Sequence, residues 1–246
     1  MVATLLILGG TADARDLAQA LAGRPGLRVI TSLAGRTDAP RLPPGEVRVG
    51  GFGGAPALAD YLRRRGVDAV VDATHPFAAR MGRHAADACA AVGVPLLRLE
   101  RPAWQAQPGD DWREVDDWPQ AVAALGDARR VLLALGRQEV APFAALSHVW
   151  FLIRSVHAPD PMPPFAQAQV LLARGPFTPE DERVLLARHG IDTIVCKNSG
   201  GPMDAKLAAA REMGVRVVMR RRPTRPDLPV AGSVAGVLDW LTAVAG

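Results

Sequence analysis

Several residue types are scarce in this 246-residue chain, and each scarcity excludes a class of protein. Two cysteines, Cys89 and Cys196, are too few for a disulfide scaffold or a cysteine zinc cluster, so a reducing, cytoplasmic location is expected. A single tyrosine among 5% aromatic residues argues against a stacking platform for nucleic acid. The apolar run at residues 2–8 is too short to span a bilayer, so neither a signal peptide nor a membrane partner is expected.

Lysine is also scarce. Only two of the 29 basic side chains are lysines, Lys197 and Lys206, and both fall in one short stretch. The net charge is +4, and a basic surface attracts nucleic acid, an anionic membrane or an anionic small molecule. Because an ammonium and a guanidinium are not interchangeable, the two lysines are candidates for a chemical role, with chance as the alternative.

Several catalytic motifs are missing. The chain has neither the P-loop pattern nor the G-x-S-x-G turn of serine hydrolases. Tyr61 is followed four residues later by Arg65, whereas a short-chain dehydrogenase has lysine there. His84 and His189 have no ligand partner four residues on, so no metal site is expected.

The sequence does contain an alternation of buried strands and helices. The apolar run at residues 5–8 ends at two glycines, and helical spacing follows over 13–21. Further strands are expected at 27–32, 47–49, 69–72 and 95–99, with helices at 56–65 and 78–91. This order predicts an α/β protein with parallel sheets covered by helices on both faces. The proline-rich residues 159–164 are expected to form an extended loop.

The second half of the chain repeats the first. Three segments recur in the same order: residues 66–71 at 190–195, 93–94 at 214–215, and 101–102 at 222–223. The repeat predicts two Rossmann-like domains related by internal duplication, with a cleft between them. The irregular, aromatic-rich stretch 101–128 holds the boundary, so the expected domains are 1–117 and 118–246.

The first candidate site is the turn formed by Gly9, Gly10, Thr11 and Ala12. It joins a buried strand to a helix, where backbone N–H groups and the helix dipole favour a phosphate. The turn departs from the G-x-G-x-x-G pattern, since Thr11 and Ala14 replace the second and third glycines. A tight turn with no ligand is the alternative interpretation.

The second strand indicates which dinucleotide would bind. NAD-binding units carry an acid about 20 residues after the glycines, to hold the ribose 2′-hydroxyl. No acidic residue occurs between Asp16 and Asp38, and Ser32 and Arg36 stand there instead. A hydroxyl and a guanidinium suit a 2′-phosphate, which predicts NADP as the nucleotide.

Thr74 and His75 follow the strand expected at 69–72, at the sheet edge where open parallel sheets bind ligands. His75 is a candidate proton donor or a wall of a nicotinamide pocket, and a structural histidine that caps the next helix is the alternative.

The second half has a matching polar turn. Lys197, Asn198, Ser199 and Gly200 follow the expected strand that ends at Cys196, and Lys206 lies shortly after. Lysine, amide and glycine groups at such a turn form an anion-binding nest. The two turns are expected to face each other across the cleft.

Together these motifs resemble the precorrin-6A reductase family of cobalamin biosynthesis. The resemblance rests on residues 8–15, 32–36, 72–78, 197–206 and 222–223, and it extends from residue 5 to about residue 240. It implies an enzyme that uses NADPH to reduce the C18–C19 double bond of precorrin-6A, giving precorrin-6B. Hydride would go to C19 and a proton to C18, with no metal or flavin required.

The resemblance also implies roles for individual residues. The nucleotide would be held by Gly9, Gly10, Thr11 and Ala12 at the pyrophosphate, Ser32 and Arg36 at the 2′-phosphate, and Thr74 and His75 at the nicotinamide ribose. The polycarboxylate tetrapyrrole would be bound by Lys197, Asn198, Ser199, Gly200, Lys206 and Arg137. No side chain is assigned as the proton donor to C18, although His75 is a candidate. Neighbouring pathway enzymes are expected to hand over the substrate.

Other functions fit part of the sequence. A cobalt-precorrin-6A reductase of the anaerobic route carries the same motifs. A non-catalytic anion- or nucleotide-binding module, or an unrelated NADP reductase or sugar-nucleotide enzyme, fits the first half but leaves the second unexplained. The presence of cobalt in the substrate, the oligomeric state and the exchange of an edge strand between the halves stay open.

Overall fold

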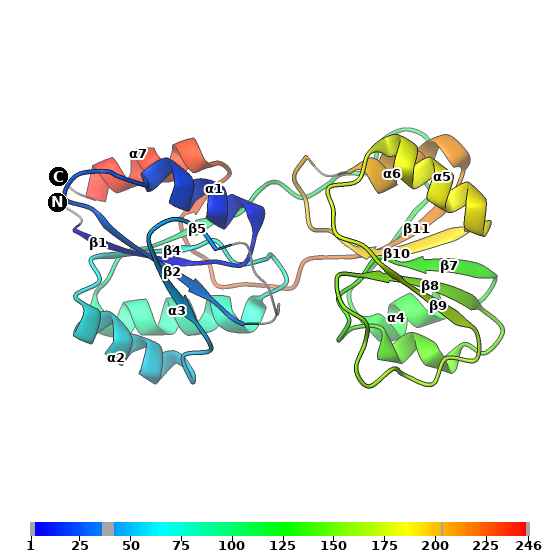
Figure 1. Cartoon of the computed structure of the whole chain (residues 1–246), viewed down its shortest axis with the longest axis horizontal. Coiled ribbons are helices and arrows are strands. Elements are labelled where there is room, and N and C mark those ends of the chain that lie inside the picture. Colours follow the sequence, from blue (N-terminus) through cyan, green and yellow to red (C-terminus); the bar gives the residue numbers. More distant parts are fainter. Residues whose placement is uncertain (1–2, 36–41, 203, 245–246) are drawn as a thin grey trace. The chain divides into compact units, whose positions relative to one another are not determined.

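The chain folds into two compact α/β units (Figure 1). We describe a computed structural model in which residues 3–35, 42–202 and 204–244 are placed. The first unit comprises Met1–Pro102 and Pro223–Gly246, and the second comprises Ala103–Arg222. Each unit has one six-stranded sheet, and neighbouring strands are parallel throughout. The predicted α/β architecture is confirmed.

The first sheet has the strand order β12-β5-β4-β1-β2-β3. Its strands are β1 (Thr4–Leu8), β2 (Arg28–Leu33), β3 (Glu46–Val49), β4 (Ala69–Asp72), β5 (Leu96–Leu99) and β12 (Val230–Ala231). Helices α1 (Ala12–Leu21) and α7 (Val234–Val244) cover one face, and α2 (Ala55–Arg65) and α3 (Ala79–Val92) cover the other (Figure 1). Because both faces are covered, every residue of β1 and β4 is buried.

The second sheet has the order β6-β11-β10-β7-β8-β9. Its strands are β6 (Trp112–Val115), β7 (Arg130–Leu133), β8 (Trp150–Ser155), β9 (Ala168–Leu172), β10 (Thr193–Lys197) and β11 (Arg216–Arg220). Helices α5 (Pro179–His189) and α6 (Ala205–Met213) cover one face, and α4 (Trp118–Ala123) and the 3₁₀ helix η1 (Ala141–Ala145) the other. Residues 159–164 form a loop without helix or strand, as expected.

The duplication is visible in both topology and hydrogen bonding. If β7 is equated with β1, the two sheets have the same strand order. Asp68 accepts hydrogen bonds from the backbone N–H groups of Ala3 and Thr4, and Asp192 does the same for Arg129 and Arg130. The repeated aspartate therefore ties the start of β4 to the start of β1 in the first unit, and the start of β10 to the start of β7 in the second.

The edge strands are exchanged between the halves. β6 follows β5 in the chain but pairs with β11, whereas β12 follows β11 but pairs with β5. The expected boundary between 117 and 118 is therefore wrong, since the chain crosses after Pro102 and returns after Arg222. The expectation of an irregular linker at 101–128 is also wrong, because β6 and α4 lie within it.

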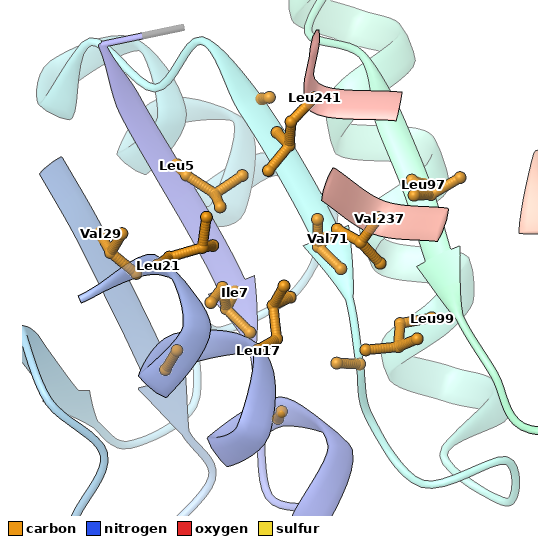
Figure 2. Packing of buried hydrophobic residues seen from close by; sticks show 14 of the residues in the cluster. Leu5, Ile7, Leu17, Leu21, Val29, Val71, Leu97, Leu99, Val237 and Leu241 are labelled. Atoms are coloured by element: carbon orange, nitrogen blue, oxygen red, sulfur yellow. The ribbon is translucent and has the colours of Figure 1, made fainter. Parts of the chain in front are cut away.

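The core of the first unit explains why the last residues belong to it. Val237 and Leu241 of α7 pack against Val71, Leu97 and Leu99 in one buried cluster (Figure 2). Without α7, the β4 and β5 side of this face would be exposed to water, because α1 alone does not cover it. Among the helices of the described residues, none is both long and apolar enough to cross a bilayer.

Candidate functional site

The turn between β1 and α1 lies tightly against β2. The backbone N–H of Gly9 donates to the carbonyl of Ser32 at 2.9 Å, and a Cβ on Gly9 would lie only 3.0 Å from Cγ2 of Thr31. Gly10 has φ of 115°, which disfavours any side chain, and the space beyond its Cα is open. The turn is thus packed closely against β2 at Gly9 and has open space beside Gly10.

Thr11 connects this turn to the end of β4. Its hydroxyl accepts a hydrogen bond from the N–H of Ala14 at 3.1 Å, so Thr11 caps α1. The same hydroxyl donates to the carbonyl of Ala73 at 2.8 Å. One side chain therefore fixes the start of α1 and the residue after β4 in a single arrangement.

Thr74 and His75 lie at this same edge, in the turn between β4 and α3. Oδ1 of Asp72 accepts from both the N–H and the hydroxyl of Thr74, at 3.1 and 2.6 Å. Nδ1 of His75 accepts from the N–H of Phe77 at 3.2 Å, so Nε2 carries the proton of the neutral ring. The bond lies within the turn and orients the ring, but it does not cap α3, which begins at Ala79 without a side-chain cap.

A buried charge cluster supports the turn that holds Thr74. Arg225, which follows the return crossing, pairs with Asp72, and it bonds to Glu100 at 3.0 Å. The side chains of Arg225 and Asp72 are 4% and 0% exposed, so the two charges neutralise each other out of contact with water. Burial, with a smaller contribution from Asp72, raises the pKa of the nearby Cys89 thiol to about 12.

In the second unit, Lys197 ends β10 beside the turn after β7. Its ammonium forms an ion pair with Glu139, and Arg220 at the end of β11 lies 3.9 Å from the same carboxylate. Arg137 lies in the same turn as Glu139. The structure therefore brings the candidates Lys197 and Arg137 to one sheet edge, as the parallel pairing of β7 with β10 requires.

The Asn198 side chain is hydrogen-bonded to the main chain. Its side-chain amide accepts from the N–H of Trp104 at 2.8 Å and donates to the Trp104 carbonyl at 2.9 Å. The Trp104 indole donates to the carbonyl of Gly201 at 2.7 Å, and Lys206 lies 4.3 Å from the indole centroid. These contacts give Asn198 a positioning role and place Lys206 on an aromatic face.

Ser199 and Gly200 lie in the loop that continues from β10. Arg222 donates to the carbonyls of Asn198 and Ser199, at 3.0 and 3.2 Å. Gly200 has φ of 67°, a value that favours glycine. In the first unit Arg101, the repeat counterpart of Arg222, pairs instead with Asp13 in the first turn of α1 at 2.6 Å.

The edge of the second sheet also has a cavity of about 540 Å³. Arg137 and Gln138 line one side, and the rest of the wall is formed by Ala141, Asp160, Pro161, Met162, Pro163 and Pro164. The size is in the range of small-molecule sites, about 300–1,000 Å³. Its wall combines the guanidinium of Arg137, the amide of Gln138 and the carboxylate of Asp160 with apolar side chains.

The two units differ where a phosphate would bind. In the first, the turn leads into the ten-residue helix α1, whereas in the second it leads into the five-residue 3₁₀ helix η1. The helix N-terminus that favours a phosphate is therefore built at this position only in the first unit. At the ends of β10 and β11 the second sheet instead carries Lys197 and Arg220, while Arg154 of β8 is buried in an ion pair with Glu182. Within the described ranges, three metal-ligating side chains come together nowhere.

Comparison with known proteins decides the family. The family model described as precorrin-6x reductase CbiJ/CobK matches residues 4–242. The chain belongs to the precorrin-6x reductase family. Membership makes it a reductase, and the recognition made from the sequence motifs is confirmed.

Individual family members are similar over nearly their whole length. The precorrin-6A reductase of Rhodococcus erythropolis is 51% identical over 241 residues, 96% of each chain. That of Rhodobacter capsulatus is 46% identical, covering 96% of this chain and 95% of its own. The solved structure of CobK precorrin-6A reductase is 44% identical with a TM-score of 0.94, covering 100% of this chain and 98% of that one.

Sequence patterns missed several residues that build these sites. Glu139, Arg225 and Trp104 each contact a candidate residue or its loop from a distant part of the chain. The repeated Arg-Pro pair was a usable signal for Arg222, but no local pattern marks the other three. Arg36, expected at the nucleotide site, lies outside the described residues.

Proposed function

We propose that this protein reduces the C18–C19 double bond of precorrin-6A with NADPH, giving precorrin-6B. The observation that carries the proposal is the β1–α1 turn, which hydrogen bonds tie to β2 and to the residue after β4. Relatives named precorrin-6A reductase reach 51% identity, whereas the cobalt-precorrin-6A reductase of Priestia megaterium is 32% identical over 89% of this chain. This difference favours precorrin-6A over its cobalt-bearing counterpart as the substrate.

The residues of the first unit fit a dinucleotide. The open backbone at Gly9, Gly10, Thr11 and Ala12 would hold the pyrophosphate at the N-terminus of α1. Ser32 lies one residue before the end of β2, and no acidic residue occurs nearby in the sequence, so Ser32 and Arg36 would hold a 2′-phosphate. Thr74 and His75 would border the nicotinamide ribose. Bound NADPH supplies the hydride.

The second unit would bind the tetrapyrrole through its carboxylates. Lys197, Lys206 and Arg137 supply positive charge at one sheet edge, and Ser199 and Gly200 supply a loop that Arg222 holds in place. Lys197 forms an ion pair with Glu139, and a carboxylate of the substrate would replace Glu139 as the partner of Lys197. The enzyme would work mainly by holding the nucleotide and the substrate at the distance and orientation that the reaction needs, without a nucleophilic side chain.

The nucleotide assignment is tested by titrating the protein with NADPH and with NADH. We expect tight binding of NADPH and a preference that Arg36→Glu removes. Loss of a guanidinium–phosphate contact plus a new repulsion should cost about 2–4 kcal/mol, roughly 30- to 1,000-fold in affinity. An assay with precorrin-6A under NADPH then tests turnover. If neither nucleotide binds, the proposal fails and an anion-binding module becomes the better account.

The substrate assignment is tested with Lys197→Met. We expect KM for precorrin-6A to rise about 10- to 100-fold, because a charged hydrogen bond contributes about 1.5–3 kcal/mol. The affinity for NADPH should stay the same. Arg188→Met is the matched control, since it removes one positive charge from the last turn of α5, near the opposite edge of the sheet. If both variants raise KM equally, Lys197 contributes only to the overall positive charge of the protein and does not bind the substrate directly.

A further inference from the structure

Arg48, on the edge strand β3, lies beside the candidate 2′-phosphate site. In the parallel register of β2 and β3, Ser32 is the partner of Arg48. Nη1 of Arg48 donates to the Ser32 hydroxyl at 3.3 Å. A guanidinium that no sequence motif marks therefore lies next to Ser32, one residue before the carboxyl end of β2.

The guanidinium of Arg48 is held in one orientation. It lies 3.9 Å from the centroid of the Phe52 ring, and it donates to the carbonyls of Gly50 and Gly51, the latter at 2.8 Å. These contacts fix the plane of the group before a ligand arrives, which lowers the entropy that binding must overcome.

The charge of Arg48 has no counter-ion among the described residues. Within the part of the chain that the structure describes, no carboxylate forms an ion pair with it, whereas Arg28 and Arg65 share Glu46 of the same strand. Carbonyl groups and an aromatic face orient a guanidinium without neutralising it. A half-buried, oriented cation without a counter-ion suits a doubly charged phosphate.

The end of β2 is where a dinucleotide-binding unit meets the adenosine ribose. We propose that Arg48, together with Ser32, binds the 2′-phosphate and thereby determines the preference for NADPH over NADH. The inference rests on the proposed function, since it needs a dinucleotide bound at the first unit. It assigns specificity to a residue whose backbone is fixed in the sheet, in addition to Arg36.

The test uses fragments that differ only in the 2′-phosphate. Affinities of the full-length protein for 2′,5′-ADP and 5′-ADP, and for NADPH and NADH, are measured by calorimetry for wild type, Arg48→Met and Arg48→Lys. Arg48→Met should weaken 2′,5′-ADP and NADPH about 10- to 100-fold and leave 5′-ADP and NADH unchanged. Arg48→Lys should lose part of the preference, because lysine keeps the charge but not the planar donor pair. Arg64→Met, on the exposed last turn of α2, is the charge-matched control and should bind as wild type does.

Two results overturn the inference while leaving the proposed function intact. One is a wild-type preference for NADPH that Arg48→Met retains within about twofold, a change below 0.5 kcal/mol. The other is an equal loss for NADPH and NADH, which would mean that Arg48 only supports the loop at Gly50 and Gly51. Equal binding of NADPH and NADH by wild type would instead contradict the proposed function itself.

Discussion

Deleting residues 233–246, a segment that includes α7 (Val234–Val244), is expected to unfold the first unit and leave the second folded. Val237 and Leu241 are 0% and 7% exposed, and burying them stabilises the unit by about 3–6 kcal/mol in total. Deletion also exposes Val71, Leu97 and Leu99 beneath the helix. Total stabilities are about 5–15 kcal/mol, so this loss is decisive.

Amide hydrogen exchange measures the result unit by unit. Protection should disappear in β1, β4 and β5 and persist in β7, β10 and β11. The point variant Val237→Ala should weaken the first unit by about 1–3 kcal/mol, whereas Val184→Ala, at a valine 55% exposed on α5, should change little. Loss of protection in the second unit instead would mean that the contiguous division at 117/118 is the correct one.

Replacing Asp72 by alanine is expected to destabilise the first unit by about 3–5 kcal/mol, because the buried Arg225 would lose one of its two carboxylate partners and keep only Glu100. Asp72 also holds the Thr74 backbone and hydroxyl, so any protein that folds should bind NADPH more weakly. Chemical denaturation gives the first quantity, and nucleotide titration below the unfolding transition gives the second.

The double variant Asp72→Leu with Arg225→Met provides the control. Apolar replacement of both partners removes the buried charge of Arg225, so stability should recover in part, although the bond between Arg225 and Glu100 is lost. Nucleotide affinity should remain low because Thr74 is still unsupported. If Asp72→Ala matches wild type in unfolding free energy, the ion pair contributes nothing to the fold and the account of this cluster is wrong.

Much of the fold could be predicted because its signals are local. Buried runs such as residues 5–8 and helical spacing such as residues 13–21 depend on neighbours within a few positions. The elements expected in the first hundred residues are all present, with each end within one residue. The repeated Gly-x-Asp segments mark a duplication in which Asp68 and Asp192 make the same hydrogen bonds.

The candidate site was predictable to the same extent. Turns after buried strands mark the ligand edge of a parallel sheet, so Thr11, Thr74 and Lys197 were named from sequence and do lie at such edges. Their partners were not predictable. Glu139 and Arg225 reach the same edges from 58 and 153 residues away, and no periodic pattern connects positions so far apart.

The sequence alone determined the α/β class, the duplication, the glycine turn and the family, because each of them depends on short contiguous sequence patterns. Only the tertiary structure decided which sheet receives β6 and β12, since strands of four and two residues carry too little pattern to choose a partner. It also decided that Arg48 lies beside Ser32 and that Asn198 holds Trp104. These depend on pairing between distant segments, which is fixed by burial of the whole core rather than by local preference.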